Sequence, residues 1–302
     1  MLRKLYAKLF ATNLVMSAAH YLRNEKPRLK ILDSVGTMDY IEKTNCSVAR
    51  FGEGEFKWVL FPEEANWGFQ DHNPEMAKRL ADVLASKDPN LLICLPYALN
   101  NIWGRTQDSR NFWYYWSERN DQRKQITDLI RSYHGTEKIF GDTQISRPYI
   151  AWKTKKNADI MFPRLKGLWA GKDIIIVEGV KTRLGVGNDL FTCAKSIKRI
   201  LGPATNAFDH LDEILAKIEE VHTNELIIMA LGPTATILAA ELSAKGIQAI
   251  DIGHVDIEYE WYLRGAKKHD LIPGKFTNEA AQGSNVDDCD DEWYNSQIVA
   301  RI

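Results

Sequence analysis

Runs of apolar residues that end at glycine, proline or a charged residue recur along this chain, and they predict strands. Such runs lie at 48–51, 90–96, 173–178, 225–231 and 248–252. Strands that are continuous in apolar residues are typical of a parallel sheet covered on both faces. Between them, amphipathic stretches at 74–86, 122–133, 189–200 and 235–245 predict helices. The alternation implies right-handed crossovers and an α/β fold with a mostly parallel sheet.

The domain organisation predicted from this pattern is one compact unit. We expect an N-terminal helix within residues 1–30, a single domain over 31–275 and a tail over 276–302 that packs on the domain. Residues 97–158 form a partly helical insertion in this prediction. Its aromatic residues at 103, 112–116 indicate core packing, a lid or a sugar-stacking surface, and the sequence leaves these open.

The N-terminus is basic and partly apolar, which raises the question of a membrane. Leu5, Leu9, Phe10 and Leu14 can share one helical face. A packed helix is the plainest interpretation, and a helix resting weakly on anionic lipid is a second one. A cleaved signal peptide is a third, although Lys8 interrupts the apolar stretch.

Composition excludes some classes of function without identifying a particular one. The net charge of −1 over 302 residues gives no basic field that would favour nucleic acid. The four cysteines, Cys46, Cys94, Cys193 and Cys289, are widely spaced, so we expect free thiols in an intracellular chain and no zinc knuckle. No stretch has the length of an uncharged transmembrane helix.

An acidic pair follows the first apolar run. Glu53 and Glu55 flank Gly54, directly after Gly52. In extended backbone, side chains two residues apart point to the same side. Two carboxylates at a strand end suit a divalent cation that bridges phosphates, although a solvated turn explains the pair as well.

Two glycine-bearing loops follow later strands. The 179–188 loop carries Lys181, Arg183, Gly185 and Gly187 ahead of the helix expected at 189–200, and its amides could bind a diphosphate. It matches neither the Walker loop nor the dinucleotide fingerprint, and an ordinary turn is the alternative. Residues 232–236 repeat the arrangement, with capping by Thr234 as the simpler explanation.

Polar residues follow two further strand ends. His254, Asp256 and Glu258 lie just past the 248–252 strand. Asp142 and Arg147 lie in a polar loop that could hold a sugar hydroxyl and a phosphate, or simply be a capped turn. Because ligands of open α/β sheets bind outside the carboxyl ends of the strands, these groups are expected to share one site. The acidic run at 287–292 is expected to be a solvated patch.

Four motifs in this order resemble the GT-D fold glycosyltransferases. They are Arg50-Phe-Gly-Glu-Gly-Glu-Phe56, the Glu178-Gly and Arg183-Leu-Gly-Val-Gly-Asn-Asp-Leu-Phe191 segments, Leu231-Gly-Pro-Thr-Ala235 and Asp251-Ile-Gly-His-Val-Asp-Ile-Glu-Tyr-Glu-Trp261. The resemblance runs from about 48 to about 262. It implies a Rossmann-like sheet with helices on both faces. It also implies transfer of a hexose, glucose or galactose, from a UDP-sugar with Mn²⁺ or Mg²⁺ on the diphosphate.

The resemblance also implies roles for individual residues. The family's Asp-x-Glu signature places its Glu on Glu55 and its Asp on Glu53, which is a departure in this chain. Glu53 and Glu55 are then the metal ligands, and Glu55, Asp256, His254 and Asp142 are the catalytic candidates, with the general base open between Asp256 and Asp142. The expected UDP-sugar contacts are Arg50, Gly52, Arg147, Lys181, Arg183, Gly185, Gly187, Asn188, Gly232, Pro233 and Thr234.

The same resemblance implies a glycan or glycoprotein acceptor, such as a surface glycoprotein or an exported polysaccharide, and a bacterial cytoplasmic enzyme. No nucleic acid is expected, and a homodimer is left open. Two other functions fit the phosphate loops. One is a nucleotide- or phosphosugar-processing enzyme without transfer, and the other is a non-catalytic subunit that binds a nucleotide sugar.

Overall fold

The computed structural model describes residues 13–23, 28–62, 70–277, 286 and 289–302, and it contains a nine-stranded sheet. The strands are β1 (Lys30–Ile31), β2 (Ser47–Arg50), β3 (Leu91–Leu95), β4 (Ile139–Asp142), β5 (Asp173–Gly179), β6 (Ser196–Gly202), β7 (Leu226–Ala230), β8 (Ala249–Asp251) and β9 (Ile298–Arg301). Their order is β1-β4-β3-β2-β8-β7-β5-β6-β9, and every pairing is parallel. The predicted α/β class is confirmed.

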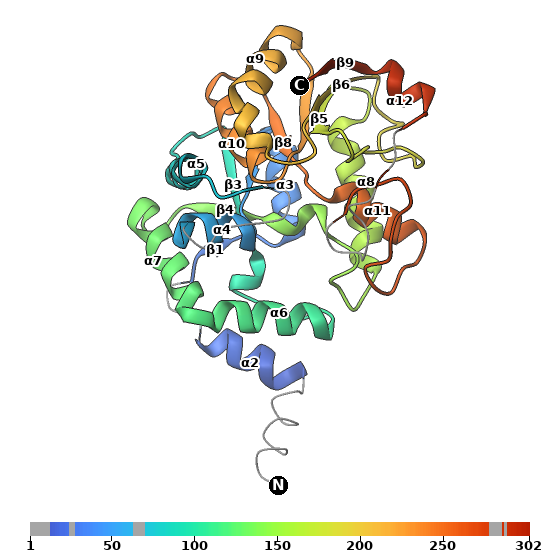
Figure 1. The fold of residues 1–302 in the computed structure, drawn as a ribbon. Coiled ribbons are helices and arrows are strands. Elements are labelled where there is room, and N and C mark those ends of the chain that lie inside the picture. Colours follow the sequence, from blue (N-terminus) through green and yellow to red (C-terminus); the bar gives the residue numbers. More distant parts are fainter. Residues whose placement is uncertain (1–12, 24–27, 63–69, 278–285, 287–288) are drawn as a thin grey trace.

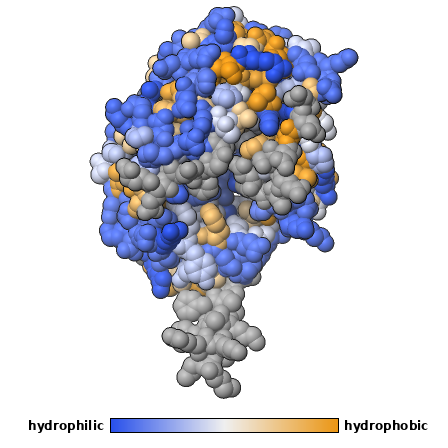
Figure 2. Space-filling model, in the orientation of Figure 1, coloured by the Kyte–Doolittle hydropathy of each residue, from blue (hydrophilic) through white to orange (hydrophobic). Residues whose placement is uncertain are grey.

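Helices cover both faces of this sheet (Figure 1). The helices are α2 (Asn13–Arg23), α3 (Ser34–Thr44), α4 (Glu53–Leu60), α5 (Pro74–Ala85), α6 (Gln107–Glu118), α7 (Gln122–His134), α8 (Lys156–Trp169), α9 (Leu211–Val221), α10 (Pro233–Ala244), α11 (Val255–Leu263) and α12 (Glu292–Ser296). Side chains alternate along each strand, so Ala49 and Ile175 pack with one helical layer and Val48 and Ile174 with the other. This explains why β3 and β7 are apolar throughout. The outer face seen in Figure 2 is mostly hydrophilic, with hydrophobic residues gathered towards its top.

The five predicted strands are confirmed, and so are the helices predicted at 74–86, 122–133 and 235–245. The helix predicted at 189–200 is wrong. Ser196–Gly202 is strand β6, which pairs with β5 and β9. Leu190, Ala194, Ile197 and Leu201 have helical spacing, but pairing on both sides decides the conformation because it satisfies the backbone groups of this segment.

The chain ends contribute to the packing in different ways. Strand β9, from the C-terminal tail, closes the sheet beside β6, where Arg199 Nε donates to Gln297 Oε1 at 2.7 Å. The 97–158 segment supplies β4 as well as α6 and α7, so part of it belongs to the sheet itself.

Helix α2 packs on α6, at the end of the molecule opposite β9 (Figure 1). Within α2, Met16 is buried, and His20 Nε2 lies 2.7 Å from the carbonyl oxygen of Ala98. Leu5, Leu9 and Phe10, used to predict a helix here, lie outside the described residues. Among the described residues, no helix combines the length and apolar character needed to span a bilayer.

Candidate active site

A cleft of about 730 Å³ opens where the strands of the sheet end. Its lining includes the residues at or just after six strand ends, namely Arg50, Thr143, Gly179, Pro203, Gly232 and Gly253. The chain order reverses here, because β2 continues to β3 on one side while its other neighbour, β8, is reached from β7. Ligands of open α/β sheets bind at such switch points.

Glu53 and Glu55 line this cleft, but not in the geometry that the sequence suggested. They lie in the first turn of α4, where residues two apart differ in direction by about 200°, so the prediction that both point to the same side of an extended chain is wrong. Glu55 turns back to the start of its own helix, and its Oε2 accepts a hydrogen bond from Gly52 N at 2.7 Å. Burial raises the pKa of Glu55 to about 7, and the carboxylates of Glu53 and Asp251 add to the shift.

Arg50 brings positive charge to the same region and is held by three elements. Its Nη2 donates to Asp251 Oδ1 at 2.8 Å, and its Nη1 donates to Ser146 Oγ at 2.8 Å and to Thr143 O at 3.2 Å. Asp251 is buried, which raises the pKa of its carboxyl. No role was predicted for Asp251, although an acidic residue that ends a buried apolar strand was a usable signal.

His254 and Asp256 also line the cleft, at the start of α11. Asp256 is buried and fully engaged. Its Oδ1 accepts from Gly185 N at 2.9 Å and Asn188 Nδ2 at 2.8 Å, and Lys275 Nζ donates to its Oδ2 at 2.5 Å. The predicted anion site in the 183–188 loop therefore contains an internal anion, the Asp256 carboxylate.

The remaining predicted residues divide between the cleft and its surroundings. Arg147, Gly232 and Pro233 line the cleft. Asp142, Lys181, Arg183, Gly185, Gly187, Asn188 and Thr234 are absent from its lining. The expectation that the 179–188 loop opens a helix is wrong, because the next regular element is β6. The binding of a diphosphate by amides of this loop stays a prediction.

Asp142 makes hydrogen bonds that stabilise the local fold. Its Oδ1 accepts from Tyr97 N at 3.1 Å and from Gln144 N at 3.0 Å, and Ser34 Oγ donates to its Oδ2 at 2.7 Å. The side chain is buried, and burial raises its pKa. Its contacts are those of the capped turn that was the alternative for this loop.

Two parts of the lining were not identified from the sequence as site residues. One is the start of α6, which contributes Thr106, Asp108, Ser109, Phe112 and Trp113. The other is Lys267, Lys268 and His269, after α11. The aromatic density at 112–116 was the signal for the first, and the adjacent lysines were the signal for the second.

The described side chains of the cleft provide only part of the ligand set of a divalent cation. Within the part of the chain that the structure describes, no group of three or more His, Cys, Asp or Glu side chains has an arrangement that could hold a metal. Glu53 and Glu55 offer hard oxygen ligands, and Glu55 is a desolvated carboxyl whose ionised form a cation would favour. Mg²⁺ in phosphate-transfer sites is commonly bound by one or two carboxylates, with phosphate and water completing its shell. Either glutamate can supply a carboxylate of this kind, and both line the cleft.

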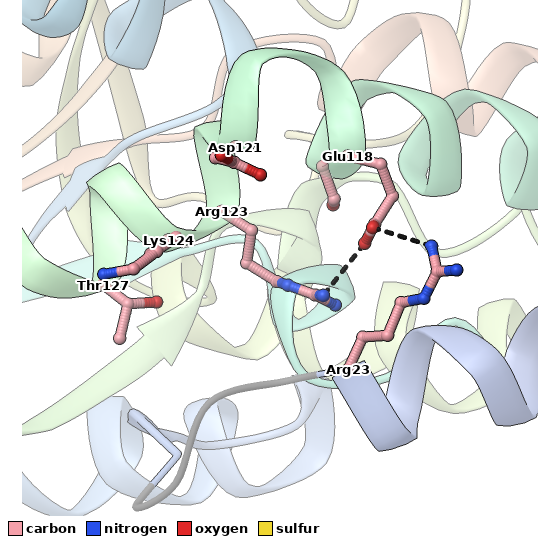
Figure 3. Close-up of a pocket in the computed structure, with 7 residues that line it drawn as sticks. Arg23, Glu118, Asp121, Arg123, Lys124 and Thr127 are labelled. Carbon is pink, nitrogen blue, oxygen red and sulfur yellow. Dashed lines mark hydrogen bonds and ion pairs between the residues drawn. The ribbon is translucent and has the colours of Figure 1, made fainter.

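A second, smaller hollow lies between α2, α6 and α7 (Figure 3). Glu118 lies between two arginines there, accepting from Arg23 Nη1 at 3.1 Å and from Arg123 Nη2 at 2.9 Å. These ion pairs join α2 to α6 and α7, so we interpret this hollow as part of the contact by which α2 packs against the other two helices.

Comparisons with known proteins agree on one family. The sequence profile described as "Glycosyltransferase GT-D fold" matches residues 48–280. The "Glycosyltransferase GlyD" of Streptococcus pneumoniae serotype 4 is 38% identical over 282 residues, which cover 92% of this chain and 33% of that protein. The "Probable glycosyl transferase Gly" of Streptococcus gordonii is 36% identical over 281 residues, covering 92% of this chain and 39% of that protein. The chain thus spans 33% and 39% of the lengths of these two relatives.

Solved structures give the same result. A structure described as "The highly conserved domain of unknown function 1792 has a distinct glycosyltransferase fold" aligns with a TM-score of 0.83 at 39% identity, covering 95% of this chain and 98% of that one. "A New Glycosyltransferase (DUF1792) from Streptococcus sanguinis" aligns with a TM-score of 0.80 at 36% identity, covering 91% of this chain and 100% of that one.

Proposed function

Because the chain belongs to the GT-D fold glycosyltransferases, we propose that it transfers a hexose, glucose or galactose, from a UDP-sugar to a glycan acceptor, with Mn²⁺ or Mg²⁺ as cofactor. The observation that carries the proposal is the meeting of Arg50, Glu53, Glu55 and Asp251 at the switch point of the sheet, inside one large cleft. Positive charge from a bound cation or from a fixed side chain stabilises a diphosphate in such a place.

The donor end of the site follows from these residues. Glu53 and Glu55 are the groups that would hold the metal, and a metal so held supplies positive charge that offsets the charge developing on the leaving diphosphate. The Arg50 guanidinium, fixed by Asp251 and Ser146, lines the same cleft and brings positive charge to it. Gly232 adopts a positive φ of 55° before α10, and with Pro233 it forms the cleft wall beside the first turn of that helix.

The acceptor hydroxyl must lose its proton as its oxygen bonds to the anomeric carbon and the bond to the diphosphate oxygen breaks. Of the two sequence candidates for the base, Asp142 is buried and outside the cleft lining. Asp256 lines the cleft, but Lys275, Gly185 and Asn188 occupy its oxygens. Both therefore serve better as positioning residues. We assign His254, which lines the cleft next to Asp256, to orienting substrate or phosphate.

The acceptor proposed from the family resemblance is a glycan on a surface glycoprotein or polysaccharide, met in the cytoplasm. Because the relatives are much longer than this chain, further parts of a longer protein can add steps that this domain lacks. Weak contact of the N-terminal helix with a membrane surface and homodimer formation stay predictions.

The test is UDP release from UDP-glucose and UDP-galactose, with and without MnCl₂. Metal-dependent release, even as slow hydrolysis without an acceptor, supports transfer. An enzyme that processes phosphosugars without transfer would leave both donors intact, and a non-catalytic subunit would bind UDP without releasing it from either donor.

A further inference from the structure

The cleft has two chemically different walls. The wall at the strand ends carries the ionisable groups of Arg50, Glu53, Glu55 and His254. The wall contributed by α6 carries an aromatic ring, a hydroxyl and a carboxylate, those of Phe112, Ser109 and Asp108. The proposed donor accounts for the first wall and leaves the second without a ligand.

Phe112 is a large apolar side chain kept in contact with solvent. It is 46% exposed, whereas its neighbour Trp113 is 4% exposed. The two rings meet edge to face, with centroids 5.2 Å apart and planes at 83°, and Trp113 meets Trp116 in the same way at 5.5 Å. An exposed aromatic ring that rests on a buried one and lines a cleft is typical of a ligand contact.

Asp108 lies one turn before Phe112 on the same helix. Its carboxylate makes no hydrogen bond or ion pair with any described residue. A carboxylate without a counter-ion disfavours an anionic ligand nearby and favours a neutral one that offers hydroxyl donors. A ring face beside such a carboxylate is the combination that a sugar requires, because a sugar has an apolar face and a rim of hydroxyls.

Hydrogen bonds fix the α6 wall of the cleft relative to the end of strand β4. Thr106 N donates to Ala151 O at 2.9 Å, Lys153 N donates to Gly104 O at 3.0 Å, and the buried Arg105 guanidinium donates to Gln144 Oε1. Gln144 follows β4 directly, so the start of α6 is anchored beside the β4 end of the cleft. In the sheet β4 is two strands from β2, about 10 Å at a spacing of about 4.8 Å per strand.

The other arm of the cleft is longer and less polar. It runs from β8 past β7 and β5 to β6, three strands or about 14 Å, and is lined by Leu231, Pro203, Ala204 and Ala207. With the diphosphate near Arg50 and Glu55, the nucleoside fits this longer arm. The hexose then points towards β4 and α6, where the acceptor must meet it.

We propose that Phe112 and Asp108 form the acceptor subsite, in which the terminal sugar of the acceptor glycan stacks on Phe112 and donates hydroxyl hydrogen bonds to Asp108. This inference rests on the proposed transfer function. It assigns the start of α6 to recognition of the acceptor saccharide and leaves the metal and donor to the strand ends.

The test is saturation-transfer NMR of three probes, methyl β-D-glucoside, methyl β-D-galactoside and methyl N-acetyl-β-D-glucosaminide, with the full chain, UDP and MgCl₂. The variants are Phe112→Ala, Asp108→Asn and the ring-preserving Phe112→Tyr. The matched control is Tyr115→Ala, because Tyr115 is 65% exposed on the same helix and is not part of the cleft lining. UDP affinity is measured for each protein by calorimetry.

We expect at least one glycoside to bind the parent protein. Its signal falls about fivefold or more in Phe112→Ala and Asp108→Asn, and is retained in Phe112→Tyr and Tyr115→Ala. Unchanged glycoside signals in Phe112→Ala overturn the subsite. A loss of UDP affinity in Phe112→Ala that exceeds the loss of glycoside signal also overturns it, because it assigns the ring to the nucleobase.

The two proposals fail in different ways. A parent protein that releases UDP from a UDP-hexose but binds none of the three glycosides contradicts the acceptor subsite alone. A parent protein that neither binds UDP nor releases it contradicts the proposed function, and the subsite with it.

Discussion

Gly253 lies directly against the guanidinium of Arg50. A Cβ atom on Gly253 would lie 2.0 Å from Arg50 Nη2 and 3.0 Å from Arg50 Cζ, and the backbone of Gly253 has a φ of 43°. Two residues after the end of strand β8, the chain thus has a residue without a side chain at the point where Arg50 reaches across to Asp251. Because Gly253 has no side chain, the Arg50 guanidinium can lie at this point. Its positive charge is the one that we assign to binding the donor diphosphate.

The first prediction concerns this contact. Gly253→Ala should displace Arg50 and lower kcat/KM for UDP release about tenfold or more, because the guanidinium loses its bonds to Asp251 and Ser146. The matched control is Gly246→Ala, also at positive φ (76°) but with no atom within 4 Å of the added methyl group. The control should cost about 1 kcal/mol of stability and little activity. Equal activity losses in the two variants would contradict the role of the contact.

The second prediction concerns the dependence of stability on pH. The pKa of Glu55 is raised from 4.5 to about 7 in the folded protein, so the folded state retains a proton that the unfolded chain has lost. This group therefore contributes most below pH 4.5, and its contribution is lost as the pH rises towards 7. Glu55→Gln should flatten that part of a melting-temperature profile. A variant profile parallel to that of the parent would show that Glu55 is not the group responsible.

The third prediction concerns the buried ion pair behind the cleft. Lys275 and Asp256 are both nearly inaccessible, and Lys275 Nζ also lies 3.4 Å from Glu260 Oε1. Lys275→Met leaves the Asp256 carboxylate without its cation, whereas Glu260 keeps its ion pair with Arg264, so the free energy of unfolding should fall by about 3 kcal/mol or more in urea titrations. The exposed pair of Lys30 with Glu137 provides the control, because Lys30→Met removes only a solvent-screened ion pair and should cost little stability. Similar costs for the two variants would argue against a buried pair.

The fourth prediction compares two lysines. Lys268 lines the cleft and is mostly exposed, whereas Lys181 is absent from the lining. Lys268→Ala should weaken UDP binding several-fold, about 1 kcal/mol, and the effect should shrink at high salt. Lys181→Ala should leave the affinity within about twofold, as measured by calorimetry. A larger loss of UDP affinity in Lys181→Ala than in Lys268→Ala would favour the 179–188 loop as the diphosphate site.

The strands were predictable where burial on both faces demands apolar residues throughout, as in 173–178 and 225–231. Strand β6 was not, because its exposed first half carries Ser196 and Lys198, and its buried Arg199 is neutralised by Glu178 Oε1 at 2.5 Å. A buried charge whose partner lies on a neighbouring strand has no local signature in the sequence. Strand β9 at the sheet edge alternates in exposure, and its apolar run, 298–300, is only three residues long.

The candidate site was predictable in its local motifs and not in its long-range contacts. Arg50, Glu53, Glu55, Gly232 and His254 belong to short segments after strands, and the fold brings them to one cleft. The conformation of the acidic pair was misjudged because Gly52 begins a helix, with Glu55 bonded back to the Gly52 amide. The carboxylate oxygens of Asp256 bond to Gly185 and Lys275, which lie 71 and 19 residues away in the chain. The sequence near Asp256 does not predict these contacts.

The measurement closest to the central claim is UDP release from UDP-glucose and UDP-galactose by the parent protein and Glu55→Gln, with MnCl₂ and with EDTA. The parent protein should release UDP from at least one donor only with the metal. Glu55→Gln, folded by circular dichroism, should be slower by about a hundredfold, a loss of about 2.7 kcal/mol of transition-state stabilisation. Metal-dependent release at the parent rate by Glu55→Gln would contradict the assignment of this cleft as a metal-assisted UDP-hexose site.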